Sequence, residues 1–216
     1  MANGKFITLE GGEGAGKTTQ RNRLAERLNA LGYDVVVTRE PGGSPGAEMI
    51  RNLLVQGETS RWQPTTELLL HFAARNEHVI HTVRPALEQG AWVISDRFAD
   101  STMAYQGIGL GVGREAVKSL YTLTVGDLKP DLTLILDLPV DVGLERAKVR
   151  HAGNGSGEDR YERMGRAFHA RLRDAFLDIA QQEPKRCAVV DASGDVDAVA
   201  VAVWAEVQSR LGLRPR

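Results

Sequence analysis

The chain has 216 residues, of which 42% are hydrophobic and 25% charged, as in a soluble globular domain with a full core. Its formal net charge of -1 lacks the basic excess of a nucleic-acid-binding domain. The single cysteine, Cys187, excludes an internal disulfide and suggests a reducing compartment. No apolar stretch is long enough to span a bilayer or to form a signal peptide. We therefore expect a cytoplasmic protein that binds neither nucleic acid nor membrane.

Five short apolar runs alternate along the chain with longer stretches of helical periodicity. The runs are continuous rather than alternating, as in strands covered on both faces, and they occupy residues 5–10, 34–39, 91–96, 132–138 and 187–191. This alternation predicts an α/β fold with a five-stranded parallel sheet flanked by helices. No repeat or linker divides the chain, so residues 1–216 are predicted to form one domain.

A glycine-rich stretch follows the first run and reads G-x-x-x-x-G-K-[ST] from Gly11 to Thr18. A strand before it and leucines at helical spacing after it are the context of a P-loop. In a P-loop, backbone N–H groups and the helix N-terminus hold phosphates. Lys17 would then contact the β- and γ-phosphates, and Thr18 would offer its hydroxyl to Mg²⁺. The alternative is a glycine-rich turn capped by Thr18. The motif predicts the three-layer P-loop NTPase fold.

Charged residues end the third predicted strand, in the sequence Asp96-Arg97-Phe98. Ligands of open α/β sheets bind at the carboxyl ends of the strands. Asp96 is therefore a candidate second partner for Mg²⁺, and Arg97 a candidate phosphate clamp. The alternative is an ordinary Asp–Arg pair at a strand exit. The helix that follows offers hydrogen-bonding groups suited to a base and a sugar, from Ser101, Tyr105 and Gln106.

Residues 63–89 carry an apolar stripe that predicts a long helix. Phe72 by itself reads as a core residue. Arg75 lies three residues further on and shares its face, and an aromatic ring beside a guanidinium can also hold a planar ligand. Both interpretations of Phe72 remain open from the sequence.

A glycine-rich stretch, His151–Gly157, is bounded by the basic residues Arg146, Arg150 and Arg160. Composition alone suggests a plain surface loop. In a phosphate-transfer enzyme the same pattern is typical of a mobile lid, which would span approximately residues 146–162.

These stretches together resemble the bacterial thymidylate kinase family of P-loop nucleoside monophosphate kinases. The matching stretches run in the family's order through the chain: Glu10–Thr19, Thr38–Gly43, Asp96–Phe98 with Ser101, Ala104–Gly107, Leu136–Pro139 and Asp159–Glu162. The P-loop alone names only a superfamily. The Glu-Pro-Gly-Gly turn combined with Asp-Arg-Phe and Tyr-Gln-Gly is far more specific.

The resemblance implies an enzyme that transfers the γ-phosphate of ATP to dTMP, giving dTDP for dTTP synthesis, with Mg²⁺ as cofactor. It also implies a homodimer. Thr18 and Asp96 would hold the metal. The implied ATP-binding residues are Gly11, Gly12, Glu13, Gly14, Ala15, Gly16, Lys17, Thr18, Thr19, Asp191 and Ala192.

The resemblance likewise implies an acceptor site in which Phe72 stacks on thymine, with Arg75 and Gln106 at the polar edge of the base. Arg51 and Arg97 would hold the acceptor phosphate. The implied dTMP-binding residues are Glu13, Glu40, Pro41, Arg51, Phe72, Arg75, Arg97, Ser101, Tyr105 and Gln106. The implied catalytic residues are Glu13, Lys17, Arg97, Arg150 and Arg160.

One departure from the family pattern concerns the source of the catalytic cation. Some members have an arginine directly after the P-loop acid, where this chain has Gly14. The resemblance then implies a lid arginine, Arg150 or Arg160, with Arg146 behind them. Two other interpretations stay open: a nucleotide kinase of different acceptor, and a P-loop switch protein, although the chain lacks the N-K-x-D guanine-reading motif.

Overall fold

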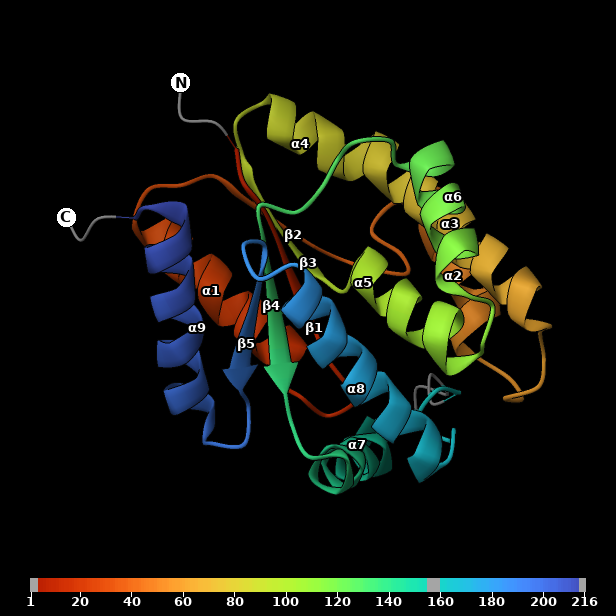
Figure 1. The fold of residues 1–216 in the computed structure, drawn as a ribbon. Coiled ribbons are helices and arrows are strands. Elements are labelled where there is room, and N and C mark those ends of the chain that lie inside the picture. Colours follow the sequence, from red (N-terminus) through yellow and green to blue (C-terminus); the bar gives the residue numbers. More distant parts are fainter. Residues whose placement is uncertain (1–3, 155–159, 214–216) are drawn as a thin grey trace.

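A computed structural model describes residues 4–154 and 160–213 of the chain. The strands and the helices that pack against their two faces follow one another in βα order (Figure 1). The strands are β1 (Phe6–Glu10), β2 (Val35–Arg39), β3 (Trp92–Asp96), β4 (Leu132–Asp137) and β5 (Cys187–Asp191). The helices are α1 (Lys17–Ala30), α2 (Pro45–Val55), α3 (Pro64–His78), α4 (Arg84–Glu88), α5 (Ala99–Thr102), α6 (Arg114–Thr124), α7 (Val140–Asn154), α8 (Arg166–Gln182) and α9 (Val196–Leu211).

The sheet is parallel throughout, with the strand order β2-β3-β1-β4-β5. This confirms the predicted five-stranded parallel sheet, and each predicted strand is present within one residue at either end. Every residue of the central strand β1 is buried. The continuous apolar runs in the sequence arise because both faces of the sheet are covered.

The two faces of the sheet are covered by separate groups of helices, giving three layers (Figure 1). Ile7 and Leu9 of β1 pack against α1 and α9 on one face, whereas Phe6 points to the other face and packs with Val83 and Phe98. Successive strand residues therefore enter opposite layers, as the strand period of two requires. Helix α8 covers β4 and β5 on the face of Phe6, with its Phe176 in a third cluster.

The helix predicted over residues 63–89 runs from Pro64 to Glu88 without a break in direction, as α3, a π-helical segment (Val79–Val83) and α4. A second π-helical segment, Met103–Gly109, continues α5. π-Helical turns often mark functional sites, and each segment here contributes to the lining of the cavity described below, Thr82 from the first and Tyr105 and Gln106 from the second. No helix of the described residues is both long and apolar enough to cross a membrane.

The glycine-rich stretch differs in part from its predicted loop. Helix α7 continues to Asn154, so the first residues of His151–Gly157 are helical. The residues from Val140 to Arg150 include no proline and no two adjacent glycines, so the helix that they form continues into the glycine-rich stretch. The rest of the predicted lid includes residues 155–159, which lie outside the described residues, as do the side chains of residues 150–154.

Candidate active site

A cavity of about 870 Å³ opens at the carboxyl ends of the strands. Parallel register brings the ends of β1, β2 and β3 to one edge, where Leu9 and Arg39 both pair with Asp96. Most of the predicted site residues line this cavity: Glu13, Gly14, Ala15, Gly16, Lys17, Thr18, Thr19, Glu40, Pro41, Arg51, Arg75, Asp96, Arg97, Ser101, Tyr105 and Gln106. Phe72, Arg160, Asp191 and Ala192 are not among its lining residues, and Gly11 and Gly12 line a smaller neighbouring cavity.

The P-loop wraps back on the first turn of α1. Lys17 is buried and donates from Nζ to the carbonyl oxygens of Gly11 (3.1 Å) and Gly12 (2.7 Å). Burial lowers the pKa of Lys17 to about 8, and the nearby charge of Arg97 adds to this effect. The ammonium group is therefore held at the mouth of the loop in the protonated form below that pH, where it can meet a phosphate.

Gly14 is required by both backbone conformation and close packing. Its φ is +69°, in the left-handed region that favours glycine. A Cβ atom at Gly14 would overlap the carbonyl oxygen of Gly143 in α7, and a Cβ atom at Gly143 would overlap the carbonyl oxygen of Glu13. The P-loop and the start of α7 are thus in direct backbone contact through two glycines.

Thr18 and Asp96 place two oxygen ligands side by side. The Thr18 hydroxyl donates to Oδ2 of Asp96 at 2.5 Å. A hydroxyl and a carboxylate are hard ligands of the kind that Mg²⁺ takes from a protein when phosphates and water complete its octahedron. Within residues 4–154 and 160–213 no group of three or more His, Cys, Asp or Glu is arranged to hold a metal by itself. This donor set therefore fits a metal that arrives with a nucleotide.

Arg97 lies at the centre of the cavity wall. Its Nη1 donates to Gly11 O (3.1 Å) and Ser101 Oγ (3.0 Å), and its Nη2 donates to Glu13 Oε1 (2.9 Å) and Tyr105 Oη (3.0 Å). Arg97 also has φ +70°, a strained backbone for a non-glycine residue. A strained residue with so many contacts is held in one orientation, as a phosphate-binding group requires.

Burial tends to raise the pKa of Glu13, but the charges of Arg97 and Lys17 and the donated hydrogen bond from Tyr105 outweigh it and lower that pKa to about 2. Glu13 is therefore a carboxylate at any working pH. It pairs with Arg97 and helps to fix the orientation of that guanidinium in the cavity wall.

The strained turn at Arg97 is fastened by Glu10, the last residue of β1. The buried Glu10 carboxyl accepts from Phe98 N (2.7 Å) and Ser101 Oγ (2.5 Å). Burial raises the pKa of Glu10 to about 8, and the charge of Asp100 adds to the rise. Glu10 thereby ties the start of α5 to the sheet, and sequence reasoning assigned it no part in the site.

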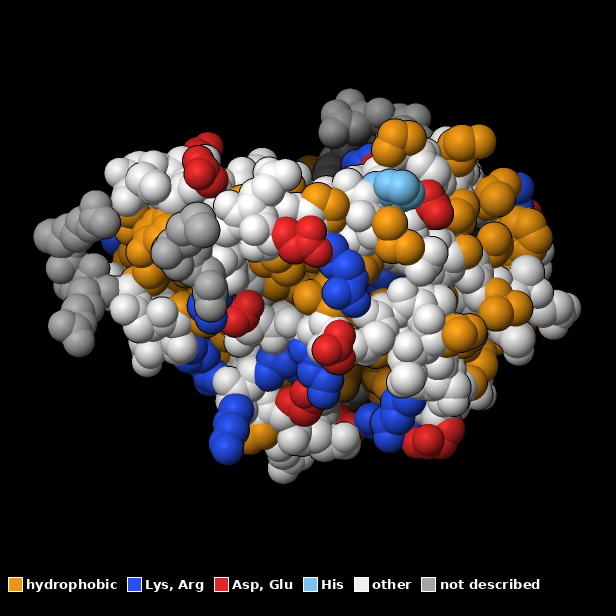
Figure 2. All heavy atoms as spheres, turned by 90° about the horizontal axis from the view of Figure 1, so that it is seen from above, with side chains coloured by type: hydrophobic (Ala, Val, Ile, Leu, Met, Phe, Trp, Pro, Cys, Tyr) orange, Lys and Arg blue, Asp and Glu red, His pale blue; other side chains and the backbone are white. Residues whose placement is uncertain are grey.

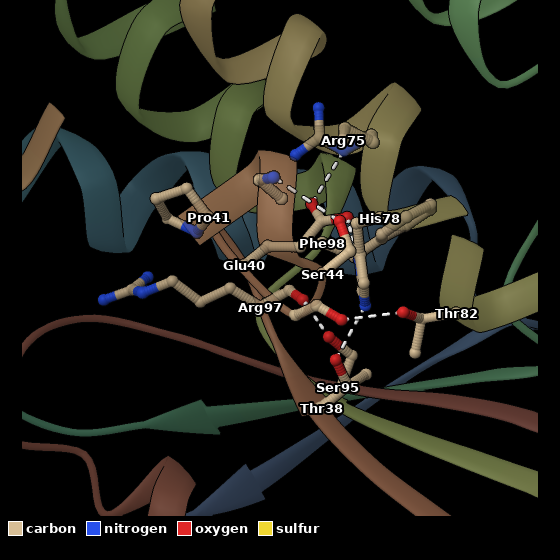
Figure 3. A network of polar contacts seen from close by, with 12 residues as sticks. Thr38, Glu40, Pro41, Ser44, Arg75, His78, Thr82, Ser95, Arg97 and Phe98 are labelled. Carbon is tan, nitrogen blue, oxygen red and sulfur yellow. Dashed lines mark hydrogen bonds and ion pairs between the residues drawn. The ribbon is translucent and has the colours of Figure 1, made fainter. Parts of the chain in front are cut away.

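A second polar network holds Arg75 (Figure 3). The buried Glu40 accepts from Arg75 Nε and contacts His78 Nδ1, both at 2.8 Å, while His78 Nε2 lies 2.7 Å from Thr38 Oγ1. The Glu40–Pro41 peptide is cis, and the Pro41 carbonyl accepts from Arg51 at 2.8 Å. Glu40 therefore lines the cavity and also fixes the orientation of Arg75 and His78.

Two buried polar atoms in this cavity have no hydrogen-bond partner among the described residues. They are Nη1 of Arg75, a donor, and Oε1 of Gln106, an acceptor. Their other atoms are engaged: Arg75 Nη2 donates to Thr102 Oγ1 (2.8 Å) and Gln106 Nε2 to Glu67 Oε1 (2.9 Å). Unpaired buried polar groups are costly, so these two atoms would suit a ligand that offers both an acceptor and a donor.

Phe72 differs from its predicted position. Its ring is 1% exposed and packs with Leu68 and Val117 in a core cluster, and the Arg75 guanidinium lies 4.8 Å from its centroid. The preceding residue, His71, lines the cavity. A helix residue's side is set by its packing partners, and the apolar partners here draw Phe72 inward. The spacing of four between His71 and Arg75 was the sequence signal that would have identified His71.

Arg160 also differs from its predicted place in a lid. Its side chain is 3% exposed and pairs with Glu67 Oε2 at 2.5 Å. It also donates to the carbonyl oxygens of Leu54, Glu58 and Thr59. Its neighbours Tyr161 and Glu162 do line the cavity. For Arg150, the side chain lies outside what the structure describes.

The predicted adenine end lies beyond the P-loop, after β5. Asp191 accepts from the Ser193 amide at 2.9 Å, and the Ala192 carbonyl accepts from Arg146 Nη1 at 3.2 Å. Arg146 therefore links α7 to the segment after β5, and these two segments would flank a base bound there.

The fold and the site define a P-loop NTPase. A family model described as thymidylate kinase matches residues 9–203. The thymidylate kinase of Caulobacter vibrioides is 54% identical over 99% of this chain and 100% of the relative, and that of Nitrobacter hamburgensis is 54% identical over 98% and 91%. A crystal structure of thymidylate kinase from Ehrlichia chaffeensis matches with a TM-score of 0.76 and 36% identity, covering 95% of this chain and 100% of that one.

The chain belongs to the thymidylate kinase family. It is accordingly an enzyme, an ATP-binding phosphotransferase that acts on small-molecule nucleotides, and the family resemblance deduced from its sequence is confirmed.

The glycine contact gives a stability prediction. Gly14→Ala forces a left-handed alanine against Gly143 and is expected to lower the free energy of unfolding by about 2 kcal/mol or more. Gly12→Ala is the matched control, since a Cβ atom there meets nothing within 4 Å, and it is expected to stay within about 1 kcal/mol of the parent. Urea denaturation measures both, and equal stabilities for the two variants would contradict the contact.

Proposed function

We propose that this enzyme transfers the γ-phosphoryl group of ATP to dTMP. The observation that carries the proposal is that two residues lining the cavity each keep one buried polar atom without a hydrogen-bond partner among the described residues, a donor on Arg75 and an acceptor on Gln106. The edge of thymine offers the O4 acceptor next to the N3–H donor, and these two groups are complementary to the donor of Arg75 and the acceptor of Gln106. A cytosine edge, with an amino donor and a bare ring nitrogen, would present the reverse pattern.

The acceptor phosphate would lie between this base end and the P-loop, held by Arg97 and Arg51. Arg97 pairs with Glu13 and donates a hydrogen bond to Ser101, and these contacts fix its orientation. Two anionic substrates repel each other, and fixed guanidinium groups offset that repulsion without reorganising during the reaction. Tyr105 Oη donates to Glu13 at 2.6 Å, so this pair forms a firm wall where the deoxyribose would pack and a 2′-hydroxyl would be crowded.

The donor nucleotide would bind with its phosphates in the P-loop, its β- and γ-phosphates at Lys17, and its adenine near Asp191 and Ala192. Thr18 and Asp96 would hold Mg²⁺, which when bound neutralises charge on the β- and γ-phosphate oxygens. The protein's own contribution is positioning: loop amides, Lys17 and Arg97 bring the two phosphates in line and keep water out.

The acceptor is tested by a nucleotide panel. Purified protein with Mg²⁺ and ATP is expected to phosphorylate dTMP faster than dUMP, dCMP, UMP or AMP, as measured by coupled ADP release and product chromatography. Lys17→Ala is expected to lower turnover by about a hundredfold or more, because the charge on the transferring group loses its nearest partner. A faster reaction with another acceptor would refute the dTMP assignment, and near-normal turnover of the variant would refute the P-loop role.

We further infer that the lid cation is Arg150, and that Arg160 anchors the segment after the lid. Arg160 is buried with four oxygen partners, and a guanidinium so engaged cannot follow a transferring phosphate. The expectation that the chain works as one kinase domain with a lid over approximately residues 146–162 is part of the same proposal.

The two arginine variants are expected to fail differently. Arg150→Ala should lower kcat by roughly a thousandfold with unchanged stability. Arg160→Ala leaves Glu67 as an unpaired buried charge and should lower the free energy of unfolding by about 3–5 kcal/mol. Steady-state kinetics and urea denaturation distinguish them. A catalytic loss confined to a stably folded Arg160→Ala protein would reverse the assignment.

We also propose that the enzyme is a homodimer joined through α2, α3 and α6, and that it acts in the cytoplasm. Large apolar side chains are exposed on these helices, at Met49, Leu53, Leu69 and Leu123, and on the π-helical segment that continues α3, at Ile80. Helices α2, α3 and α6 lie on the right in Figure 1, and Figure 2 shows hydrophobic side chains on that side of the molecule. A patch of this kind commonly marks a protein interface.

The dimer is tested by charge insertion. Leu69→Glu is expected to give a monomer in analytical ultracentrifugation, because an interface core excludes an unpaired carboxylate. Val201→Glu on α9, where the parent valine is 66% exposed, is the control and should leave the mass unchanged. A monomeric parent protein at micromolar concentration would overturn the proposal.

A further inference from the structure

We propose that His169 is a positioning residue of the P-loop: through one ordered water molecule, its Nε2 is hydrogen-bonded to the loop backbone between Gly11 and Glu13. His169 lies on α8, in none of the stretches that carry the family resemblance. The inference rests on one part of the proposed function, namely that the P-loop holds the phosphates of ATP.

The first half of the P-loop lies against β4 and α7 at two points. A Cβ atom at Gly11 would overlap the carbonyl oxygen of Leu136 in β4, and a Cβ atom at Gly143 in α7 would overlap the carbonyl oxygen of Glu13. At both points backbone therefore meets backbone directly. A small cavity of about 20 Å³ adjoins this half of the loop, and Gly11, Gly12 and Glu13 are among its lining residues.

His169 reaches the same small cavity from α8. Its side chain is buried, and its Nε2 has no hydrogen-bond partner among the described residues. Burial and the charge of Arg97 have the largest effects on the pKa of Glu13, and the charge of His169 also acts to lower that pKa. The imidazole ring is therefore close to the acidic residue of the P-loop.

The apolar surroundings make a polar ring at this position unexpected. The nearby buried side chains of α8 that face its core cluster are Phe168, Leu172 and Phe176, and the Phe168 ring lies edge-on to the His169 ring at 5.7 Å. A buried nitrogen without a partner is costly. A buried histidine among such residues is best explained by a polar contact on the side of the small cavity.

One water molecule would supply that contact. A polar cavity of about 10–15 Å³ or more can hold a water when two to four polar groups surround it. Here these groups are Nε2 of His169, the peptide groups of the loop, and the carboxylate of Asp137, which pairs with Arg173 at 2.7 Å. Water both donates and accepts, so it satisfies Nε2 in either tautomer of the ring.

The consequence concerns the shape of the loop. Glu13 lines both the small cavity and the substrate cavity, so this part of the P-loop lies between the two. Backbone amides bind a phosphate best when their orientation is fixed beforehand. Without the bridge to His169, the peptide groups from Gly11 to Glu13 would rotate more freely, and the loss would appear as weaker binding of the nucleotide phosphates.

Two variants separate this role from simple packing of α8. His169→Phe keeps a ring of similar size and removes the nitrogen, whereas His169→Gln places an amide near the position of Nε2. Ile179→Val is the matched control: it removes one methyl group from the same core cluster, at a residue that does not line the small cavity.

The experiment measures the Kd for ADP with Mg²⁺ by isothermal titration calorimetry, with thermal unfolding and steady-state kinetics alongside. His169→Phe is expected to weaken ADP binding about fivefold, the effect of one hydrogen bond. It should raise the KM for ATP by the same factor and leave kcat at saturating ATP nearly unchanged. His169→Gln should stay within about twofold of the parent Kd. Ile179→Val should lower the melting temperature without changing the Kd.

Unchanged ADP affinity in a folded His169→Phe protein would overturn the inference and leave His169 as a packing residue. Equal losses in the Phe and Gln variants would overturn it too, because the shape of the ring and not its nitrogen would then matter. If the variants do not fold, a crystal structure of the parent that resolves ordered water decides: a water bonded to Nε2 and to the loop supports the bridge, and a dry cavity refutes it.

Failure of the proposed function looks different. If the parent protein binds no ADP, or if Lys17→Ala binds ADP as tightly as the parent, the phosphate-binding role of the loop is wrong and this inference falls with it. If both tests succeed and only His169→Phe behaves like the parent, the proposed function stands and this inference alone is wrong.

Discussion

The cavity and its surroundings depend on the pairing of buried or half-buried guanidinium groups with carboxylates. Arg75 pairs with Glu40 at 2.8 Å, Arg97 with Glu13 at 2.9 Å and Arg160 with Glu67 at 2.5 Å. A buried charge without a partner costs several kcal/mol, so these arginines can lie in and beside the cavity because each has an acidic partner. Such pairs add nothing to the net charge of -1, so this near-neutral value does not reveal the charged groups inside the molecule.

Each of these pairs joins different parts of the chain. Glu67 of α3 illustrates this best, because it accepts from Gln106, Arg160 and Tyr161, which belong to two segments far apart in the sequence. The same carboxylate thus contacts a cavity-lining residue, Gln106, and the residues that follow the proposed lid, Arg160 and Tyr161. One buried network therefore links the cavity wall to the segment after the proposed lid.

The strands, the P-loop and the Asp96–Arg97 turn could be predicted because their signals are local: an apolar run, a glycine spacing, a charge at a strand end. The side of α3 that faces the cavity could not be predicted, because helical periodicity allows either His71 or Phe72 to share a face with Arg75. Only packing against the core selects between them. The burial of Arg160 could not be predicted either, because a charged residue near a glycine-rich stretch is normally expected to face solvent. Its burial depends on Glu67, whose own role becomes visible only once the chain has folded.

The contact between Gly14 and Gly143 has an evolutionary consequence. A side chain at Gly14 would clash with the backbone carbonyl of Gly143, and a side chain at Gly143 would clash with the backbone carbonyl of Glu13. Neither position can therefore change while the two segments stay in place. A lineage with this arrangement cannot acquire a P-loop arginine at position 14 through a single tolerated substitution; α7 would have to retreat beforehand. Two hydrogen atoms in place of two side chains thus constrain which catalytic solutions its descendants can reach.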